Sequence, residues 1–314
     1  MPRTIKPFLT YSEQISKLTD DKKLLISNPV LAKEALMNIS YYALIGGYKQ
    51  LFYNPMSRQY MPGTKFEDIL CLYHFDEQLR ELFFKYLCHI EQKMRSLISY
   101  HFSQTYSHLE KDYLNPSNYN YTKKNHFGIN QLIKMLTIEA RSNTNHFYVV
   151  YQRDTYGNVP LWVIMNTLTF GQISKMYSFL KTSEQTKVSQ VFRKVSEKEL
   201  GQYLKVFTYF RNVCAHNERL FSFRCRVSIP DTLLHKKLKI PQKGDCYIYG
   251  KSDLFSVVIA FRYMLDKSEF LEFKHQLRKL ISGMLNGESV LTEEVFLQSM
   301  GFPQNWESIT RYKL

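Results

Sequence analysis

The segment YFRNVCAHN, residues 209–217, combines side chains that could act on a phosphate. Arg211 precedes His216 by five positions, and Asn212 directly follows the arginine. An imidazole titrates near neutral pH and can accept or donate a proton, while a guanidinium can stabilise the extra negative charge of a phosphorane. These groups suffice for attack of a ribose 2′-hydroxyl on the neighbouring phosphate, and the reaction needs no metal ion.

The spacing of this motif is moderately specific. From the composition of the chain, R-x-x-x-x-H should occur by chance about 0.4 times and R-N-x-x-x-H only about 0.02 times. The alternative is that Arg211 pairs with a carboxylate and that His216 is a polar residue at a helix end. The spacing alone leaves both interpretations open.

Helical geometry makes Arg211 unusual. At about 100° per residue, its helix carries one apolar stripe, and Arg211 falls inside that stripe. The stripe consists of Leu200, Tyr203, Leu204, Phe207 and Cys214. Burying a guanidinium without a partner is costly, so we expect Arg211 to face an anion, an opposite charge or a shared cleft.

Other candidate sites are weaker. A second match to R-x-x-x-x-H, from Arg141 to His146, lies in a polar, turn-like run and is interpreted as chance. His101 lies close to an apolar stripe, which favours a packed core histidine. Cys214 and His216 point to different faces, which argues against a thiol protease. Aromatic residues around the first motif are expected in the core, and only those outside the stripe could stack on unpaired bases.

The charge of the chain favours a polyanionic partner. The formal net charge is +14, and residues 181–239 hold 13 basic residues against 5 acidic ones. Because this basic segment contains the motif, RNA is the expected partner. The candidate RNA-binding residues are Arg95, Arg193, Lys194, Arg219, Arg224 and Arg226. The alternative is a solvated basic face without a partner.

The elements that must position these residues are predicted to be helices. Asn28-Pro29 predicts a helix start, and Thr64-x-x-Glu67 and Ser196-x-x-Glu199 predict capping boxes. Apolar spacing predicts one long helix from Thr64 to about Tyr106 and further helices over 161–180, 197–217 and 253–285. Residues 115–160 have the composition of loops joining short helices, and 240–251 could form a small hairpin or an ordered loop.

Composition narrows the class of protein. No run reaches the roughly 18 apolar residues of a membrane helix, and the first residues lack an apolar leader. Five scattered cysteines indicate reduced thiols in a cytoplasm, with neither a disulfide framework nor a zinc site. The sequence also lacks the motifs of phosphate-binding loops, serine hydrolases and dinucleotide folds, so no metal or cofactor is expected.

Several segments, in order along most of the chain, resemble the abortive-infection proteins of the AbiD/AbiF type, which belong to the HEPN superfamily. They are ISYYALIGGY (39–48), GTKFE (63–67), LYHFDEQLR (72–80), IEQKMRSLI (90–98), PLWV (160–163), LTFGQIS (168–174), RNVCAH (211–216) and MGFP (300–303) with Trp306. The resemblance implies an all-α HEPN-type bundle with an additional N-terminal helical region. We place that region at 1–125, the HEPN-like domain at 126–235 and a helical extension at 236–314.

The resemblance also implies a function: metal-independent endoribonuclease activity in phage defence or as a toxin, restrained by a structured noncoding RNA. By analogy, Arg211 and His216 are catalytic, Asn212 supports them, and Arg95 is a candidate for a second site. The N-terminal half lacks a second clean R-x-x-x-x-H, so a homodimer would have to supply the second copy. Two alternatives remain: an RNA-binding or phage-sensing module without catalysis, and a DNA-binding regulator, against which the lack of a clear helix-turn-helix counts.

Overall fold

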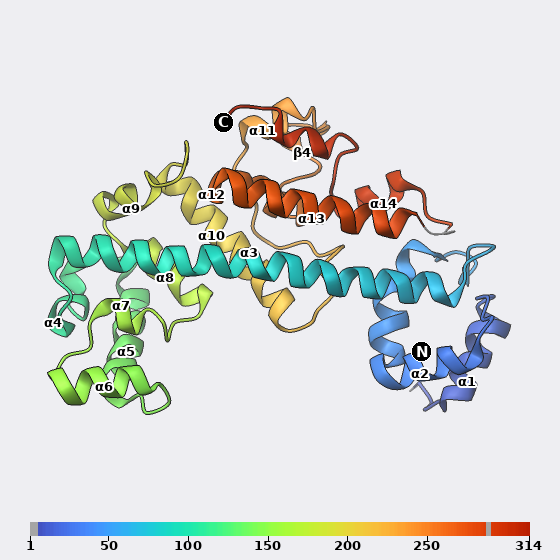
Figure 1. Ribbon diagram of the computed structural model, residues 1–314, viewed down its shortest axis with the longest axis horizontal. Coiled ribbons are helices and arrows are strands. Elements are labelled where there is room, and N and C mark those ends of the chain that lie inside the picture. Colours follow the sequence, from blue (N-terminus) through green and yellow to red (C-terminus); the bar gives the residue numbers. More distant parts are fainter. Residues whose placement is uncertain (1–5, 287–289) are drawn as a thin grey trace.

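A long helix, α3 (Phe66–Tyr106), forms the spine of the molecule in the computed structural model, which describes residues 6–286 and 290–314. Figure 1 shows α3 running along the longest axis, with helices from both halves of the chain packed against it. It buries an apolar stripe that includes Leu72, Leu79, Leu87 and Ile98. The predicted long helix is therefore confirmed, and so is the all-α helical bundle.

The N-terminal elements pack at the beginning of α3. They are α1 (Tyr11–Ser16), the π-helix η1 (Lys17–Asp21), α2 (Pro29–Ile39), the π-helix η2 (Tyr42–Gly46), the 3₁₀-helix η3 (Lys49–Leu51) and a hairpin of β1 (Tyr53–Asn54) and β2 (Gln59–Tyr60). The α2 helix starts as predicted, because the Asn28 side chain accepts a hydrogen bond from the Leu31 amide at 3.1 Å.

The predicted capping box at Thr64 is wrong. The helix α3 begins at Phe66, and the amide of Lys65 donates to Asp68 Oδ2 at 2.8 Å. The Thr64 hydroxyl instead donates to the carbonyl of Met61 at 2.7 Å, in the turn before the helix. Because Asp68 supplies the acceptor, the helix starts one residue later than the sequence pattern predicts.

Several helices follow α3 in the middle of the sequence. They are α4 (Glu110–Tyr113), η4 (Pro116–Asn118), α5 (His126–Ser142), α6 (Phe147–Tyr156), α7 (Leu161–Ile164), α8 (Phe170–Phe179) and α9 (Thr182–Ser189). Of these, α4, α7, α8 and α9 contact α3. The helix α5 is longer than the short helices expected in this region. Residues spaced by three or four positions make its buried stripe: Ile129, Leu132, Leu136 and Ala140.

The single helix predicted over 161–180 is instead two helices. Thr169 separates α7 from α8, because its side chain accepts from the amide of Gln172 and its own amide donates to the Gln172 side chain at 2.7 Å. This reciprocal capping begins a new helix at Phe170. The turn it creates brings the carbonyl of Leu168 to α3, where it contacts Arg95.

The remaining elements cover the other side of α3. The helix α10 (Glu197–Ala215) crosses the spine, while α12 (Leu254–Met264) and α13 (Lys267–Leu285) follow a short hairpin of β3 (Gln242–Lys243) and β4 (Cys246–Tyr247). The chain also forms α11 (Leu233–Lys237), α14 (Glu293–Ser299) and the 3₁₀-helix η5 (Trp306–Thr310). Figure 1 shows α13 alongside α3. The predicted hairpin at 240–251 and the capping box at Ser196 are confirmed.

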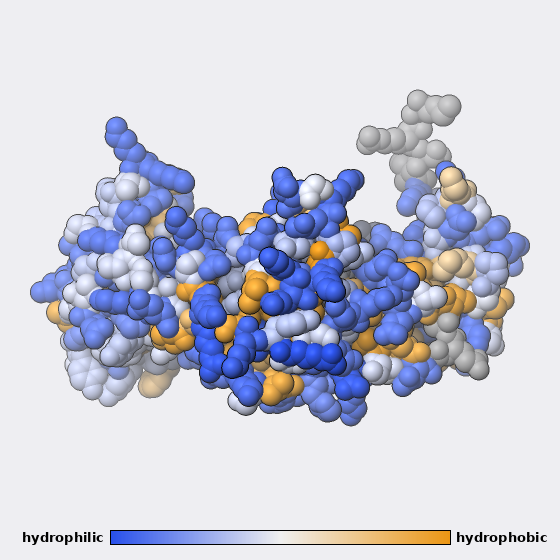
Figure 2. Space-filling model, turned by 90° about the horizontal axis from the view of Figure 1, so that it is seen from above, coloured by the Kyte–Doolittle hydropathy of each residue, from blue (hydrophilic) through white to orange (hydrophobic). Residues whose placement is uncertain are grey.

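One buried apolar cluster extends through the N-terminal, middle and C-terminal elements. The three regions predicted from the sequence stay a prediction, and α3 contacts elements of all three. The face drawn in Figure 2 is mainly hydrophilic, with smaller hydrophobic patches between charged and polar residues. Within residues 6–286 and 290–314, no helix is both long and apolar enough to cross a membrane.

Candidate functional site

The helix α10 ends directly after the R-N-x-x-x-H motif. His216 is its C-cap residue, and Asn217 adopts a left-handed conformation with φ 54°. The amides of Asn217 and Glu218 donate back to the carbonyls of Cys214 and Val213, at 3.3 and 3.0 Å. This is the hydrogen-bond pattern of a Schellman motif, in which asparagine is a common substitute for glycine. The chain therefore turns away sharply, and His216 stays exposed at the helix end.

Arg211 faces a buried carboxylate on α3. Its Nε donates to Glu91 Oε2 at 3.4 Å, and Arg95 Nη2 donates to Glu91 Oε1 at 2.5 Å. We call these three residues the Glu91 cluster. The Glu91 side chain is only 4% exposed, while the side chains of Arg95 and Arg211 are 20% and 26% exposed. Arg211 was expected to face an anion, an opposite charge or a shared cleft, and in the structure it faces an opposite charge, Glu91.

The Glu91 cluster holds more positive than negative charge, since two guanidiniums share one carboxylate. Arg95 is fixed further by donating to the carbonyl of Leu168 at 2.7 Å. The Arg211 guanidinium lies 5.7 Å from the centre of the Phe84 ring. Its terminal nitrogens make no hydrogen bond within the part of the chain that the structure describes. They remain able to donate to a phosphate in a bidentate manner.

The three residues assigned to catalysis are not joined by their side chains. The amide of His216 donates to the carbonyl of Asn212 at 2.9 Å, but no side-chain hydrogen bond links Arg211, Asn212 and His216 within the described residues. Five positions along a helix correspond to a rotation that separates Arg211 and His216 by about 140°. Within one chain, Arg211 is brought to Arg95 rather than to His216.

A second carboxylate holds the chain that follows His216. Asp76 accepts hydrogen bonds from the Tyr48 hydroxyl at 2.7 Å, from Arg80 at 2.8 Å, and from the amides of Leu220 and Phe221 at 2.9 and 2.7 Å. We call Tyr48, Asp76 and Arg80 the Asp76 cluster. Burial raises the pKa of Asp76, and the hydrogen bonds and the charge of Arg80 oppose that rise. The Asp76 cluster therefore holds residues 220–221, which follow the turn at the end of α10.

A small hollow of about 190 Å³ lies beside the end of α10. Its lining comprises Glu77, Arg80, Glu81, Phe84, Cys214 and Asn217. Burial, with a smaller contribution from Asp76, raises the pKa of the Cys214 thiol to about 12. A thiol with that pKa stays protonated near neutral pH, so Cys214 is no nucleophile here. The hollow holds two glutamates, and its one arginine, Arg80, is paired with Asp76.

The predicted RNA-binding residues lie in several places. Arg95 belongs to the Glu91 cluster, whereas Arg193 and Lys194 are exposed in the turn before α10. Arg219 donates to the carbonyl of Gly47 and lies over Phe221. The two remaining arginines follow on the loop after α10: Arg226 is exposed, and Arg224 contacts Asp253 at 3.7 Å. Within the described residues, Arg95 alone of this set shares a partner with Arg211.

The other histidine patterns have ordinary surroundings. Arg141 pairs with Glu110 at 3.3 Å, and His146 is the N-cap residue of α6. His101 is half-buried with its ring against Tyr100, and its Nδ1 lacks a partner within the described residues. These contacts give no second catalytic arrangement.

The sequence reasoning did not identify Glu91 or Asp76. Both are charged residues inside the apolar stripe of α3, the same signal that singled out Arg211. Each also has an arginine four positions later, which is the spacing of a helical ion pair. Applying the stripe argument to acidic residues would have found both.

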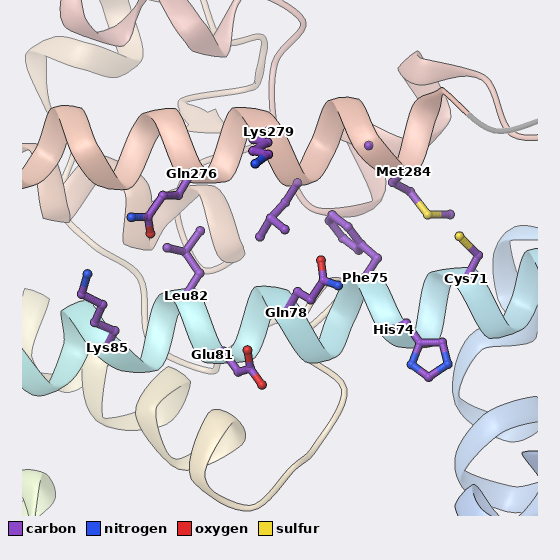
Figure 3. A pocket seen from close by; sticks show the side chains of 12 residues that line it. Cys71, His74, Phe75, Gln78, Glu81, Leu82, Lys85, Gln276, Lys279 and Met284 are labelled. Atoms are coloured by element: carbon purple, nitrogen blue, oxygen red, sulfur yellow. The ribbon is translucent and has the colours of Figure 1, made fainter.

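A larger groove than the hollow beside the end of α10 lies between α3 and α13. Figure 3 shows side chains from both helices lining it, among them Leu82 and Lys85 on α3 and Gln276 and Lys279 on α13. Its volume is about 760 Å³, and it carries both signs of charge but contains neither Arg211 nor His216. In the described part of the chain, no three His, Cys, Asp or Glu side chains are grouped to hold a metal ion.

Comparison with known families supplies one match. Residues 34–222, more than half of the chain, match the model of the Abi-like protein family. The chain belongs to the Abi-like family. The family segment contains the Glu91 cluster, the Asp76 cluster and His216, and it ends shortly after the helix-end turn. No curated protein and no solved structure matches the chain.

Proposed function

We propose that this Abi-like protein is a metal-independent endoribonuclease of the HEPN type, acting in abortive infection. The observation that carries the proposal is the Glu91 cluster, in which a buried carboxylate holds Arg211 by its Nε and leaves the terminal nitrogens for a ligand. A guanidinium preorganised in this way can stabilise the charge that develops on a phosphorane. The exposed imidazole of His216 at the end of the same helix supplies a group for proton transfer.

The reaction follows from these groups. His216 accepts the proton of a ribose 2′-hydroxyl, whose oxygen attacks the adjacent phosphorus. The bond from phosphorus to the 5′-oxygen breaks, and the leaving oxygen takes up a proton. The products are a 2′,3′-cyclic phosphate and a 5′-hydroxyl, with no net oxidation and no metal-bound water.

One imidazole cannot give and take a proton in the same step, so a second copy is part of the proposal. In a homodimer, His216 of the partner subunit protonates the leaving oxygen. Asn212, exposed on the same face of the helix end, then helps to orient the RNA. Membership of the Abi-like family supports the role in phage defence, and we place that role in the cytoplasm with a structured noncoding RNA restraining the toxin.

A second candidate function rests on the same contacts. Arg211 pairs with a carboxylate and His216 caps a helix, and both facts can be explained without catalysis. In that case the protein is an RNA-binding or phage-sensing module. It differs from the nuclease in one measurable respect, because it leaves RNA intact.

The decisive experiment compares His216→Ala with His146→Ala on a mixture of cellular RNAs. Loss of a general acid or base should slow cleavage about 10²- to 10⁴-fold in the first variant, while the second should match the unmodified protein. Cleavage should persist in EDTA and leave cyclic phosphate ends. Wild-type cleavage by His216→Ala, or activity abolished by EDTA, would favour the binding module.

A further inference from the structure

A second cavity, formed by α5, α8 and α10, adjoins the Glu91 cluster. Its volume is about 730 Å³, within the range of about 300–1,000 Å³ that small-ligand sites occupy. Thr208 lines it and lies one turn before Arg211 on α10. Thr169 also lines it and directly follows Leu168, whose carbonyl accepts a hydrogen bond from Arg95. Two residues that line the cavity are thus close in sequence to residues that belong to the Glu91 cluster or contact it.

Both charged residues that line this cavity, among those the structure describes, are cations. Lys175 and Lys205 line it, and no aspartate or glutamate is among the lining residues that the structure describes. Neither lysine makes an ion pair within the described residues. The hollow beside the end of α10 contains Glu77 and Glu81, together with Arg80, which is paired with Asp76. The charges therefore favour binding of a polyanion at the cavity, which has two lysines without an ion pair in the described residues, over the hollow, whose arginine is already paired.

Aromatic and polar groups of the cavity suit a flat heterocycle. Tyr209 is 40% exposed, although most aromatic residues around it are buried. Ser174 is only 7% exposed and lines the cavity, and its hydroxyl makes no hydrogen bond within the described residues. A serine hydroxyl can both donate and accept, so it can hydrogen-bond with a ligand atom in the cavity. Gln131 adds an amide at the rim.

We infer that this cavity binds an unpaired nucleotide of the RNA, next to the phosphate that Arg211 contacts; the inference rests on the proposed function. The base stacks on Tyr209 and hydrogen-bonds with Ser174, while Lys175 and Lys205 bind flanking phosphates. Stacking on one aromatic ring tolerates any base, and the polar groups distinguish between them. A duplex does not fit, because its bases are already stacked and paired.

The first test measures binding without cleavage, in the His216→Ala background, using a short fluorescein-labelled single-stranded RNA. Tyr209→Ala should raise the Kd about 5- to 150-fold, the usual effect of losing one stacking ring. Tyr209→Phe should retain binding. Tyr148→Ala is the matched control, because Tyr148 is also 40% exposed but lies on α6, outside the cavity. Unchanged binding by Tyr209→Ala, or equal binding of the duplex form, would overturn the inference.

The second test separates charge from stacking. Lys175→Ala and Lys205→Ala should each reduce the slope of log affinity against log salt by about 0.7, the value for one contact to a single strand. Lys198→Ala, on α10 but outside the cavity, should leave the slope unchanged. Unchanged slopes for both cavity lysines would contradict the proposed path of the RNA.

These outcomes distinguish the cavity from the nuclease. If the unmodified protein does not cleave RNA but Tyr209→Ala loses binding, the nuclease proposal fails and the cavity inference stands. If the protein cleaves RNA and Tyr209→Ala both binds and cleaves normally, the cavity inference fails and the nuclease proposal stands. Failure of the parent to bind single-stranded RNA at low salt overturns the cavity inference.

Discussion

The Asp76 and Glu91 clusters begin from the same local design and differ in charge balance. Each has a carboxylate on α3 and an arginine four positions later, and the two carboxylates are separated by 15 positions. That spacing is about four helical turns, so both face the same side of α3. Both also contact the α10 region, one through Arg211 and the other through the amides after His216.

In the Asp76 cluster the charges are matched and the polar atoms satisfied. The side chain of Asp76 is fully buried and that of Arg80 is 5% exposed, and four hydrogen bonds converge on the carboxylate. In the Glu91 cluster one carboxylate serves two cations, whose side chains reach solvent. A buried ion pair with balanced charge therefore stabilises the fold, whereas an accessible cluster with excess positive charge can bind an anion.

The largest expected effect is on stability, from Asp76→Ala. The change leaves Arg80, Tyr48 and two amides without their acceptor, so the free energy of unfolding should fall by about 3–5 kcal/mol. Denaturant unfolding followed by circular dichroism measures it. Glu77→Ala, which removes an exposed partner of His74 on the same helix, is the control and should cost about 1 kcal/mol or less. Equal effects of the two changes would refute the structural role of the Asp76 cluster.

Arg211→Ala should lower the rate of RNA cleavage and leave the stability of the fold nearly unchanged. Losing a preorganised charge at the phosphorane should slow RNA cleavage about 10²- to 10³-fold. Stability should change little, because Glu91 retains Arg95 at 2.5 Å. Most RNA binding should remain, since it is spread over many basic residues. Cleavage assays and unfolding curves of Arg211→Ala and Arg80→Ala test this together, and a large loss of stability in Arg211→Ala would contradict it.

Glu91→Gln should give a smaller, mixed effect. The amide cannot neutralise the two guanidiniums, so Arg211 is less firmly held, and cleavage should fall by less than the roughly 10²- to 10³-fold expected for losing Arg211 itself. Sulfate or phosphate can replace the missing anion between the two cations. These salts should therefore raise the melting temperature of Glu91→Gln more than that of the unmodified protein, whereas chloride at equal ionic strength should not. An identical response of both proteins to sulfate would argue against an anion site.

Local sequence patterns predict most of the helices, because capping residues and apolar spacing act over a few positions. The long α3 and the start of α10 follow from such signals. For Arg211 the local pattern predicts only that it needs a partner, with an anion, an opposite charge and a shared cleft all open. The break at Thr169 was missed because its capping contacts compete with an apolar pattern that continues across it. The choice of Glu91 as partner depends on tertiary packing between helices 120 positions apart in sequence, which local spacing does not encode.

The smallest expected effect uses Cys214, which lies between the two clusters and is influenced by Asp76, Arg80 and Arg211. Because burial raises its pKa to about 12, little thiolate is present at pH 8, and iodoacetamide should modify the exposed Cys246 first. Alkylation of Cys214 should increase only as the pH approaches 12. Asp76→Ala removes a negative charge that raises this pKa and loosens the turn after His216, so Cys214 should react faster. Arg211→Ala removes a positive charge that lowers this pKa and leaves the turn intact, so Cys214 should be alkylated no faster in Arg211→Ala than in the unmodified protein.

Mass spectrometry after alkylation at several pH values gives the rates. Faster labelling of Cys214 in Arg211→Ala than in Asp76→Ala would reverse the roles assigned to the two clusters.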